Sequence, residues 1–240
     1  MNILVTGGAS GLGESITRHL SKNKKNKIFF TYTNSKGNAD KINRDFINSE
    51  SIFCDFKDLS SVRNLCEIIE QLDLDVLINN AYCGNAIYKQ FNKTSPEIFK
   101  TDFLNNLFPT ILISQTVISH FKKRKFGKII TVLTSFLINS PPIGSSVYVA
   151  NKSYLSSLTK SWAKENIKFN ITSNSISPSF MQTKLTADVD SRVIEQIIKD
   201  HPLNTILKTD EVAEAVNFLV NASQQINGMN LIINSGENII

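Results

Sequence analysis

Short apolar runs alternate with longer stretches of helical periodicity along the 240-residue chain, and this alternation constrains the fold more than any other feature. The apolar runs have the length and composition of buried parallel strands, and they lie at residues 2–5, 27–31, 51–54, 76–78, 128–133, 170–176 and 230–233. Helical periodicity occurs at residues 12–20, 59–72, 96–121, 147–165 and 210–220. This order predicts right-handed βαβ units, and hence an α/β fold with a doubly wound, seven-stranded parallel sheet covered by helices on both faces.

A single domain spanning residues 1–240 is expected. No repeat of about 20 to 50 residues is present, and no linker rich in Pro, Gly or Ser divides the chain. A composition of 41% hydrophobic and 20% charged residues excludes a disordered, collagen-like or disulfide-rich protein. Substrate choice is therefore expected to reside in loops of the same domain, at residues 82–94, 136–147 and 180–203.

Several features indicate a cytoplasmic protein without a membrane span. The longest apolar runs are well short of the roughly 18 residues that a span needs. The chain enters its first strand directly after Met1, without the basic segment of a signal peptide. The cysteines, Cys54, Cys66 and Cys83, lack metal-ligand spacing, which indicates free thiols in a reducing compartment and no metal site.

The net charge of +5 raises the question of a nucleic-acid partner. The basic residues are spread over many expected surface helices rather than gathered in a stripe, so no nucleic-acid partner is expected. One dense cluster stands out, formed by Lys122, Lys123, Arg124 and Lys125.

A glycine-rich turn follows the first expected strand, with the sequence Thr6-Gly7-Gly8-Ala9-Ser10-Gly11-Leu12-Gly13, and a helical pattern begins at once. Glycines let the backbone turn sharply and approach a pyrophosphate, while the helix N-terminus offers free N–H groups and a partial positive charge. The turn therefore predicts a dinucleotide site, although a tight strand-to-helix connection would look the same.

Tyr148 and Lys152 are four residues apart in a helical pattern, so their side chains lie on one face. Proton transfer to a carbonyl oxygen at neutral pH needs an acid with a pKa near 7, whereas the pKa of free tyrosine is about 10. A neighbouring ammonium lowers the pKa of the phenol. The pair is thus a candidate proton donor, against the alternative of a core-facing ring and a snorkelling lysine.

The turn, Asn79-Asn80-Ala81 after the fourth strand and the Tyr148–Lys152 pair together resemble the short-chain dehydrogenase/reductase family in its single-domain form. Further positions fall in family order, namely Asp55, Asn106, the segment from Asn174 to Thr183, and Ile226-Asn227-Gly228. Within the family the chain is most similar to the β-ketoacyl-acyl-carrier-protein reductases, including Gly127-Lys128-Ile129-Ile130. The resemblance implies a Rossmann-type fold and a nicotinamide cofactor.

The resemblance also implies a set of cofactor-binding residues: Thr6, Gly7, Ser10, Gly11, Leu12, Gly13, Thr33, Asp55, Phe56, Asn80, Ala81, Tyr148, Lys152, Met181 and Thr183. Asp55 and Phe56 would border the adenine, and Met181 and Thr183 would face the nicotinamide. Asp55 could instead cap the helix that follows it.

Tyr32 closes the second strand and is followed by Thr33, Asn34, Ser35 and Lys36, so no acid is present to accept from a ribose hydroxyl. This favours NADP(H) over NAD(H), because a carboxylate there would repel a 2′-phosphate.

Four catalytic residues are implied: Asn106, Ser135, Tyr148 and Lys152. Tyr148 would donate the proton, Lys152 would lower the tyrosine pKa and bind the nicotinamide ribose, and Asn106 would kink its helix and hold a relay water. Ser135 would polarise the carbonyl, because it stands thirteen residues before the tyrosine, as in the family. Counting from the start of the strand selects Thr134 instead, and Asn105 is an alternative to Asn106.

Two positions depart from the family pattern near the expected substrate. Tyr82 follows Asn-Asn-Ala where glycine is usual, and Ser179 follows Pro178 where glycine is also usual. Both add a side chain that would narrow the pocket.

The predicted function is an NADP(H)-dependent oxidoreductase acting on a carbonyl or secondary alcohol, with a 3-oxoacyl thioester as the expected substrate. An acidic acyl carrier could dock at the cluster of Lys122, Lys123, Arg124 and Lys125, or that cluster could be a solvated helix end. The alternatives are a sugar or small secondary alcohol as substrate, or a catalytically silent nucleotide-binding sensor or assembly partner.

A homotetramer or dimer is expected from the family. The apolar stripe of Leu107, Ile111, Ser114 and Ile118 would permit such contacts between subunits, although a stripe that faces the core would look the same.

Overall fold

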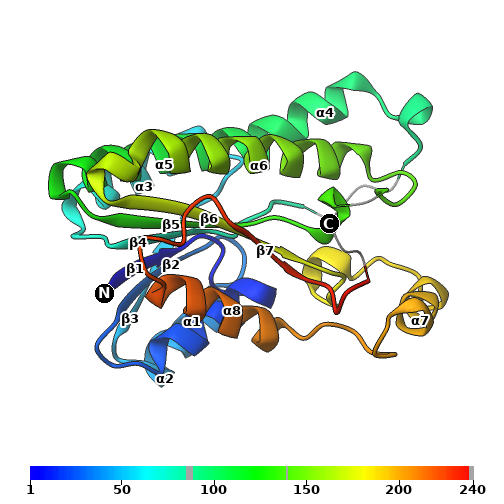
Figure 1. Ribbon diagram of the computed structural model, residues 1–240, viewed down its shortest axis with the longest axis horizontal. Coiled ribbons are helices and arrows are strands. Elements are labelled where there is room, and N and C mark those ends of the chain that lie inside the picture. The colour runs from blue at the N-terminus through cyan, green and yellow to red at the C-terminus, as the bar shows by residue number, and fades with distance from the viewer. Residues whose placement is uncertain (85–88, 139, 238–240) are drawn as a thin grey trace.

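The computed structural model describes residues 1–84, 89–138 and 140–237, which form a parallel β-sheet between two layers of helices (Figure 1). The strands are β1 Asn2–Val5, β2 Lys27–Tyr32, β3 Ser49–Phe53, β4 Val76–Asn79, β5 Gly127–Val132, β6 Ile171–Pro178 and β7 Asn230–Ile233. The helices are α1 Gly11–Ser21, α2 Lys36–Asp45, α3 Leu59–Gln71, α4 Pro96–Asp102, α5 Phe108–Arg124, α6 Ser146–Asn166, α7 Ser191–Asp200 and α8 Thr209–Asn221.

The sheet of the described residues has seven strands in the order β3-β2-β1-β4-β5-β6-β7, and every pairing is parallel. The strand order reverses between β1 and β4, which places a topological switch point at the centre of the sheet. The predicted Rossmann-type fold is thus confirmed, together with each of the predicted strands.

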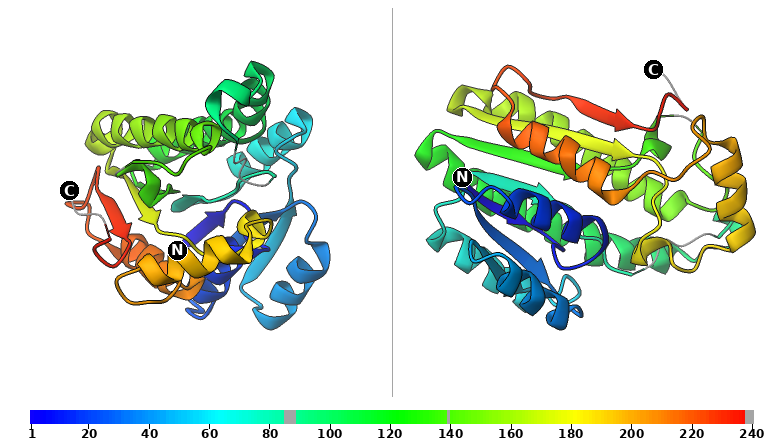
Figure 2. Two further views of the ribbon diagram at one scale, coloured as in Figure 1. Left: turned by 90° about the vertical axis from the view of Figure 1, so that its right-hand side faces the viewer. Right: turned by 90° about the horizontal axis from the view of Figure 1, so that it is seen from below.

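Each face of the sheet carries its own apolar core (Figures 1 and 2). Helices α1, α2 and α8 pack on one face, where Ile16 and Val216 are fully buried. Helices α3, α5 and α6 cover the other, where Leu65 and Val117 are fully buried. Because both faces are covered, β1, β2 and β4 are rich in buried Ile, Leu, Val and Phe, which made them recognisable in the sequence, whereas the fully buried β6 is mostly polar.

Two helices were not predicted from the sequence, for different reasons. Helix α2 buries only Ala39 and Ile42, so it shows no continuous apolar stripe. Helix α7 has no fully buried residue and lies at one end of the sheet, outside both helical layers (Figure 2). The periodic signal is weak only in α2. Helix α7 carries Val193, Ile194, Ile197 and Ile198 at helical spacing, but the sequence analysis assigned this stretch to the substrate loop at residues 180–203.

The long helix predicted for residues 96–121 is interrupted. Helix α4 leads into a π-helical turn, Phe103–Leu107, and only then does α5 begin. Pro109 lies in the first turn of α5 and has no N–H to donate to the carbonyl four residues earlier. Such π-turns often mark functional sites, and this one contains Asn106.

The stripe considered for oligomer contacts faces the core, because Leu107, Ser114 and Ile118 are buried within the single chain. The basic cluster lies at the C-terminal end of α5, which leads into the first residue of β5. It therefore lies at the edge of the sheet where strands begin.

Over the described residues, 1–84, 89–138 and 140–237, no helix has the length and apolar character of a membrane span.

Candidate active site

A cavity of about 680 Å³ opens at the carboxyl edge of the sheet. Its walls come from the segments that follow the first six strands, with the glycine-rich turn at one side and the start of α6 at the other. Ligands of doubly wound folds bind at this edge, beside the switch point. The predicted cofactor residues that line the cavity are Gly7, Ser10, Gly11, Leu12, Gly13, Thr33, Asp55, Phe56, Asn80, Ala81, Tyr148, Lys152, Met181 and Thr183.

The glycine-rich turn depends on glycine at two points. Gly7 has φ +66°, a left-handed conformation that side chains rarely adopt. A Cβ atom on Gly13 would lie 2.1 Å from the carbonyl oxygen of Gly7, so the start of α1 packs directly on the turn. The N-cap residue of α1, Ser10, makes no side-chain cap, which leaves the helix N–H groups directed toward the cavity. This geometry fits a pyrophosphate.

Thr6 is the one predicted cofactor residue that does not line the cavity. It is buried, and its Oγ1 accepts hydrogen bonds of 3.0 Å from the N–H groups of both Asn80 and Ala81. The Asn80 amide donates in turn to the Thr6 carbonyl oxygen at 2.9 Å. Thr6 therefore fixes the chain after β4 against the glycine-rich turn.

At the far end of the cavity, Tyr32, Thr33, Asn34 and Ser35 line the wall. Among the described lining residues Asp55 is the only acid. Its carboxylate accepts from the N–H of Lys57 at 2.9 Å. The N-cap of α3 is Asp58, which accepts from Ser60 N–H at 2.9 Å, so Asp55 is not the helix cap that the sequence allowed as an alternative.

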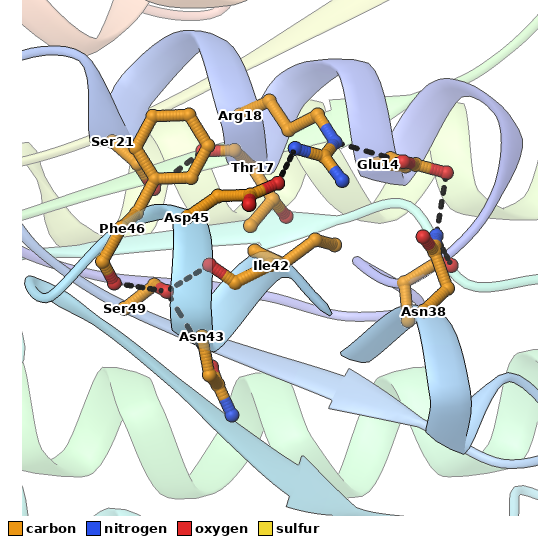
Figure 3. Close-up of polar contacts among 11 residues, drawn as sticks. Glu14, Thr17, Arg18, Ser21, Asn38, Ile42, Asn43, Asp45, Phe46 and Ser49 are labelled. Carbon is orange, nitrogen blue, oxygen red and sulfur yellow. Dashed lines mark hydrogen bonds and ion pairs between the residues drawn. The ribbon is translucent and has the colours of Figure 1, made fainter. Parts of the chain in front are cut away.

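The nearby acid Glu14 of α1 faces α2 instead of the cavity (Figure 3). Its carboxylate accepts from Arg18 at 2.8 Å and from the Asn38 amide at 2.6 Å. Asn38 also donates to the carbonyl oxygen of Ala9 in the glycine-rich turn at 2.7 Å, and Arg18 pairs with Asp45 at the end of α2. The network holds α2, and the segment before it, against the turn.

Lys152 is almost completely buried at the opposite side of the cavity. Its Nζ donates to the Val132 carbonyl oxygen at 2.7 Å and lies 5.8 Å from the centre of the Tyr148 ring. Burial lowers the pKa of Lys152 to about 8, against the opposing effect of the Asp102 carboxylate. The Lys152 amine is therefore mostly protonated at neutral pH. Its positive charge lies close to the Tyr148 phenol, whose pKa a neighbouring ammonium was predicted to lower.

Of the two hydroxyls considered for the carbonyl, Thr134 lines the cavity and Ser135 does not. Both are buried, and Ser135 begins a short 3-10 turn after β5. The Thr134 hydroxyl accepts from the N–H of Phe136 at 3.3 Å, which leaves its proton available for donation.

Asn106, also buried, lies in the π-helical turn between α4 and α5. Its side-chain oxygen accepts from the Cys83 N–H at 2.5 Å, and its amide donates to Asp102 at 3.1 Å. Tyr82 and Ser179, the departures from the family pattern, both line the cavity. The Tyr82 hydroxyl donates to Asp102 at 2.9 Å, and its ring packs edge-to-face on Tyr148 with centroids 5.3 Å apart.

Asp102 was missed in the sequence, although it contacts three side chains at the site. Its spacing of four residues before Asn106 in a helical segment was the available signal, because that spacing places both on one helix face. Among the described residues no group of three His, Cys, Asp or Glu side chains comes together as a metal site would require.

Comparison with known proteins assigns the family. A family model described as "Enoyl-(Acyl carrier protein) reductase" matches residues 7–238. The chain is 30% identical to the 3-oxoacyl-[acyl-carrier-protein] reductase FabG of Buchnera aphidicola subsp. Schizaphis graminum, over 97% of this chain and 95% of the relative. It is 29% identical to the 2-dehydro-3-deoxy-D-gluconate 5-dehydrogenase of Bacillus subtilis, over 97% of this chain and 92% of the relative.

Among solved structures, a short chain dehydrogenase from Burkholderia cenocepacia in complex with NADP is 25% identical and has a TM-score of 0.86, covering 99% of this chain and 97% of that chain. The fold and site define a dinucleotide-binding oxidoreductase that acts on CH–OH and C=O groups. The chain belongs to the short-chain dehydrogenase/reductase family.

Proposed function

We propose that this protein is an NADP(H)-dependent reductase of 3-oxoacyl thioesters. The observation that carries the proposal is the presence of Tyr148 and Lys152 in the same cavity as the glycine-rich turn. When bound, the reduced nicotinamide supplies the hydride for the carbonyl carbon. The chain's own residues then hold the carbonyl oxygen and deliver the proton.

Tyr148 donates the proton to the carbonyl oxygen. Lys152, held by the Val132 carbonyl, brings a positive charge beside the phenol and favours its ionised form in the transition state. Asn106 lies in the π-turn, where the regular helical hydrogen bonding is interrupted. In this proposal it positions a water molecule that relays a proton back to Tyr148 through Lys152. Tyr148→Phe should abolish turnover but leave NADPH binding measurable, and turnover that survived would exclude Tyr148 as the acid.

Thr134 polarises the carbonyl oxygen in this proposal, in place of the Ser135 first chosen from the sequence. The cavity lining favours Thr134, and its hydroxyl is already oriented by accepting from Phe136. A hydroxyl that accepts one hydrogen bond still has one proton to donate. The distance along the chain to Tyr148 favours Ser135, so single alanine variants at the two positions are the decisive comparison.

The preference for NADPH is supported by the lining at residues 32–35, which offers hydroxyls, an amide and the N-terminal end of α2 to an anionic group. The nearest acid on α1, Glu14, is neutralised by Arg18 and turned toward α2. The ratio of kcat/KM for NADPH and NADH measures this preference directly, and a ratio below one would exclude it.

An acyl substrate is supported by the names of the relatives and by the three loops expected to contact substrate. The loops expose large apolar side chains, namely Phe91 in the first, Ile143 in the second, and Val193 and Leu203 in the third, at 72%, 87%, 50% and 67% exposure. Residues 85–88 of the first loop and residue 139 of the second lie outside the described residues. The backbone of Lys89 donates to Gly144 at 2.9 Å, which joins the first two loops.

NADPH oxidation with an acetoacetyl thioester and with a keto-sugar, measured side by side, tests the choice of substrate. A rate on the sugar without a rate on the thioester would favour the second candidate, a sugar dehydrogenase like the Bacillus subtilis relative. Cofactor binding without turnover on any carbonyl compound would favour a silent nucleotide-binding role.

A further inference from the structure

One carboxylate gathers three side chains from separate parts of the fold. Asp102, the last residue of α4, accepts from the Tyr82 hydroxyl at 3.0 Å on Oδ1 and 2.9 Å on Oδ2. The Asn106 amide donates to Oδ1 at 3.1 Å, and the Asn151 amide donates to Oδ2 at 2.5 Å. The single Tyr82 proton is shared between the two carboxylate oxygens, so Asp102 accepts from three donor groups, within its lone-pair capacity.

These partners surround the catalytic pair without belonging to it. Asn151 immediately precedes Lys152 on α6, and Asn106 lies in the π-turn between α4 and α5. Tyr82 follows β4, with its ring 5.3 Å from that of Tyr148 and 5.7 Å from the Lys152 Nζ. A change at Asp102 would therefore release all three segments at once.

The Tyr82 hydroxyl is held as a donor and is not a second acid. Burial raises the pKa of Tyr82 first, and the Asp102 carboxylate raises it further, so the phenol keeps its proton. With the hydroxyl fixed on Asp102, the edge-to-face contact gives the Tyr148 ring a defined wall. A glycine at position 82 would provide no such wall.

Charge is the second contribution of Asp102. The titratable groups that face Lys152 are Tyr148 a turn earlier on α6, Tyr82 after β4 and Asp102 on α4, with the Val132 carbonyl from β5. Asp102 is the anion among them, and it opposes the effect of burial on the Lys152 pKa.

We propose that Asp102 is a positioning residue of the active site, which fixes the Tyr148 ring through Tyr82 and holds Asn106 and Asn151. The inference rests on the proposed carbonyl reduction. It explains why the bulky Tyr82 is compatible with the chemistry, because its hydroxyl is bonded to Asp102 and not to the substrate.

The test compares Asp102→Asn and Tyr82→Phe with the wild type, and uses Glu67→Gln on the exposed face of α3 as a matched charge control. In Asp102→Asn, kcat should fall by roughly 10- to 100-fold with little change in the KM for NADPH, since misplaced groups cost rate more than binding. The alkaline limb of the kcat profile should also move to lower pH, because loss of the anion lets burial lower the Lys152 pKa further.

Tyr82→Phe retains the ring and the Asp102 charge but removes one donor. It should lower kcat while the alkaline limb stays at the wild-type pH, and Glu67→Gln should change neither. Wild-type kcat and an unmoved limb in Asp102→Asn would overturn the inference. If that variant does not fold, an unchanged kcat in Tyr82→Phe overturns it instead.

A wild-type protein that reduces no carbonyl compound would refute the proposed function alone. An NMR titration of the Lys152 Nζ in the wild type and in Asp102→Asn does not depend on turnover. A lower midpoint in the variant supports the role of Asp102, and equal midpoints exclude it.

Discussion

Substituting Gly13 by alanine should remove cofactor binding, and Gly37 offers a matched control in the next helix. The added Cβ of Gly13→Ala would lie 2.1 Å from the Gly7 carbonyl oxygen and 2.6 Å from the Asn80 amide nitrogen. The first contact is to backbone, so α1 or the turn must move. Overpacking of this kind costs about 1–3 kcal/mol of folding free energy. At Gly37, on α2, an added Cβ meets nothing within 4 Å.

The consequences can be read as melting temperatures. For a chain of this size, 1 kcal/mol shifts Tm by about 2–4 °C, so Gly13→Ala should lower Tm by about 2–12 °C. NADPH at 100 times its Kd should stabilise the wild type by about 2.7 kcal/mol, or about 5–11 °C. Gly13→Ala should lose most of that increment, because the displaced turn no longer approaches the pyrophosphate.

Gly37→Ala should keep the full NADPH increment and gain about 0.5–1 kcal/mol, since alanine is the better helix former. Thermal unfolding with and without NADPH measures both quantities. A Gly13→Ala protein with the wild-type Tm and the wild-type NADPH increment would refute the close packing of α1 on the turn.

Three further predictions concern the site and its surroundings. Thr134→Ala should lower kcat by roughly 100-fold, which is the typical cost of losing one donor to a developing oxyanion, while Ser135→Ala should keep most of the wild-type kcat. Steady-state kinetics would show the reverse pattern if Ser135 were the donor. Thr33→Asp should shift the cofactor preference toward NADH, because a carboxylate repels the 2′-phosphate, and unchanged kcat/KM ratios for the two cofactors would contradict this. Arg124→Met should lower Tm by removing contacts to Asp73 and Asp75 yet leave the KM for a carrier-linked thioester unchanged, and a raised KM would place carrier docking there after all.

The elements predicted from the sequence are those whose pattern follows from burial alone. Strands β1, β2 and β4 appear as apolar runs because both faces of the sheet are covered, and the glycine-rich turn is specified by backbone geometry that few residues can adopt. Helix α2 was not predicted because it buries only Ala39 and Ile42, and α7 was assigned to a loop although its apolar residues have helical spacing. The family resemblance implied a kink at Asn106, and the structure places a π-turn there, next to Pro109.

The candidate site was predictable wherever its residues follow a strand in the sequence, and much less so where distant segments meet. Thr134 and Ser135 are adjacent, and only the packed structure distinguishes which of them lines the cavity. The spacing of Asp102 and Asn106 was readable in the sequence, but the contacts of Asp102 with Tyr82 and Asn151 require α4, α6 and the segment after β4 to meet, which no local spacing specifies.

The basic cluster illustrates how topology limits a composition argument. Helix α5 ends at Arg124 and β5 begins at Gly127, so the cluster lies at the amino edge of the sheet, while the cavity lies at the carboxyl edge. Arg124 is moreover bonded to Asp73, Asp75 and the Leu74 carbonyl oxygen, and the Lys122 ammonium lies over the Phe169 ring. The length of the sheet therefore separates the cluster from the cavity, and the Arg124→Met comparison tests whether an acidic carrier docks at the cluster.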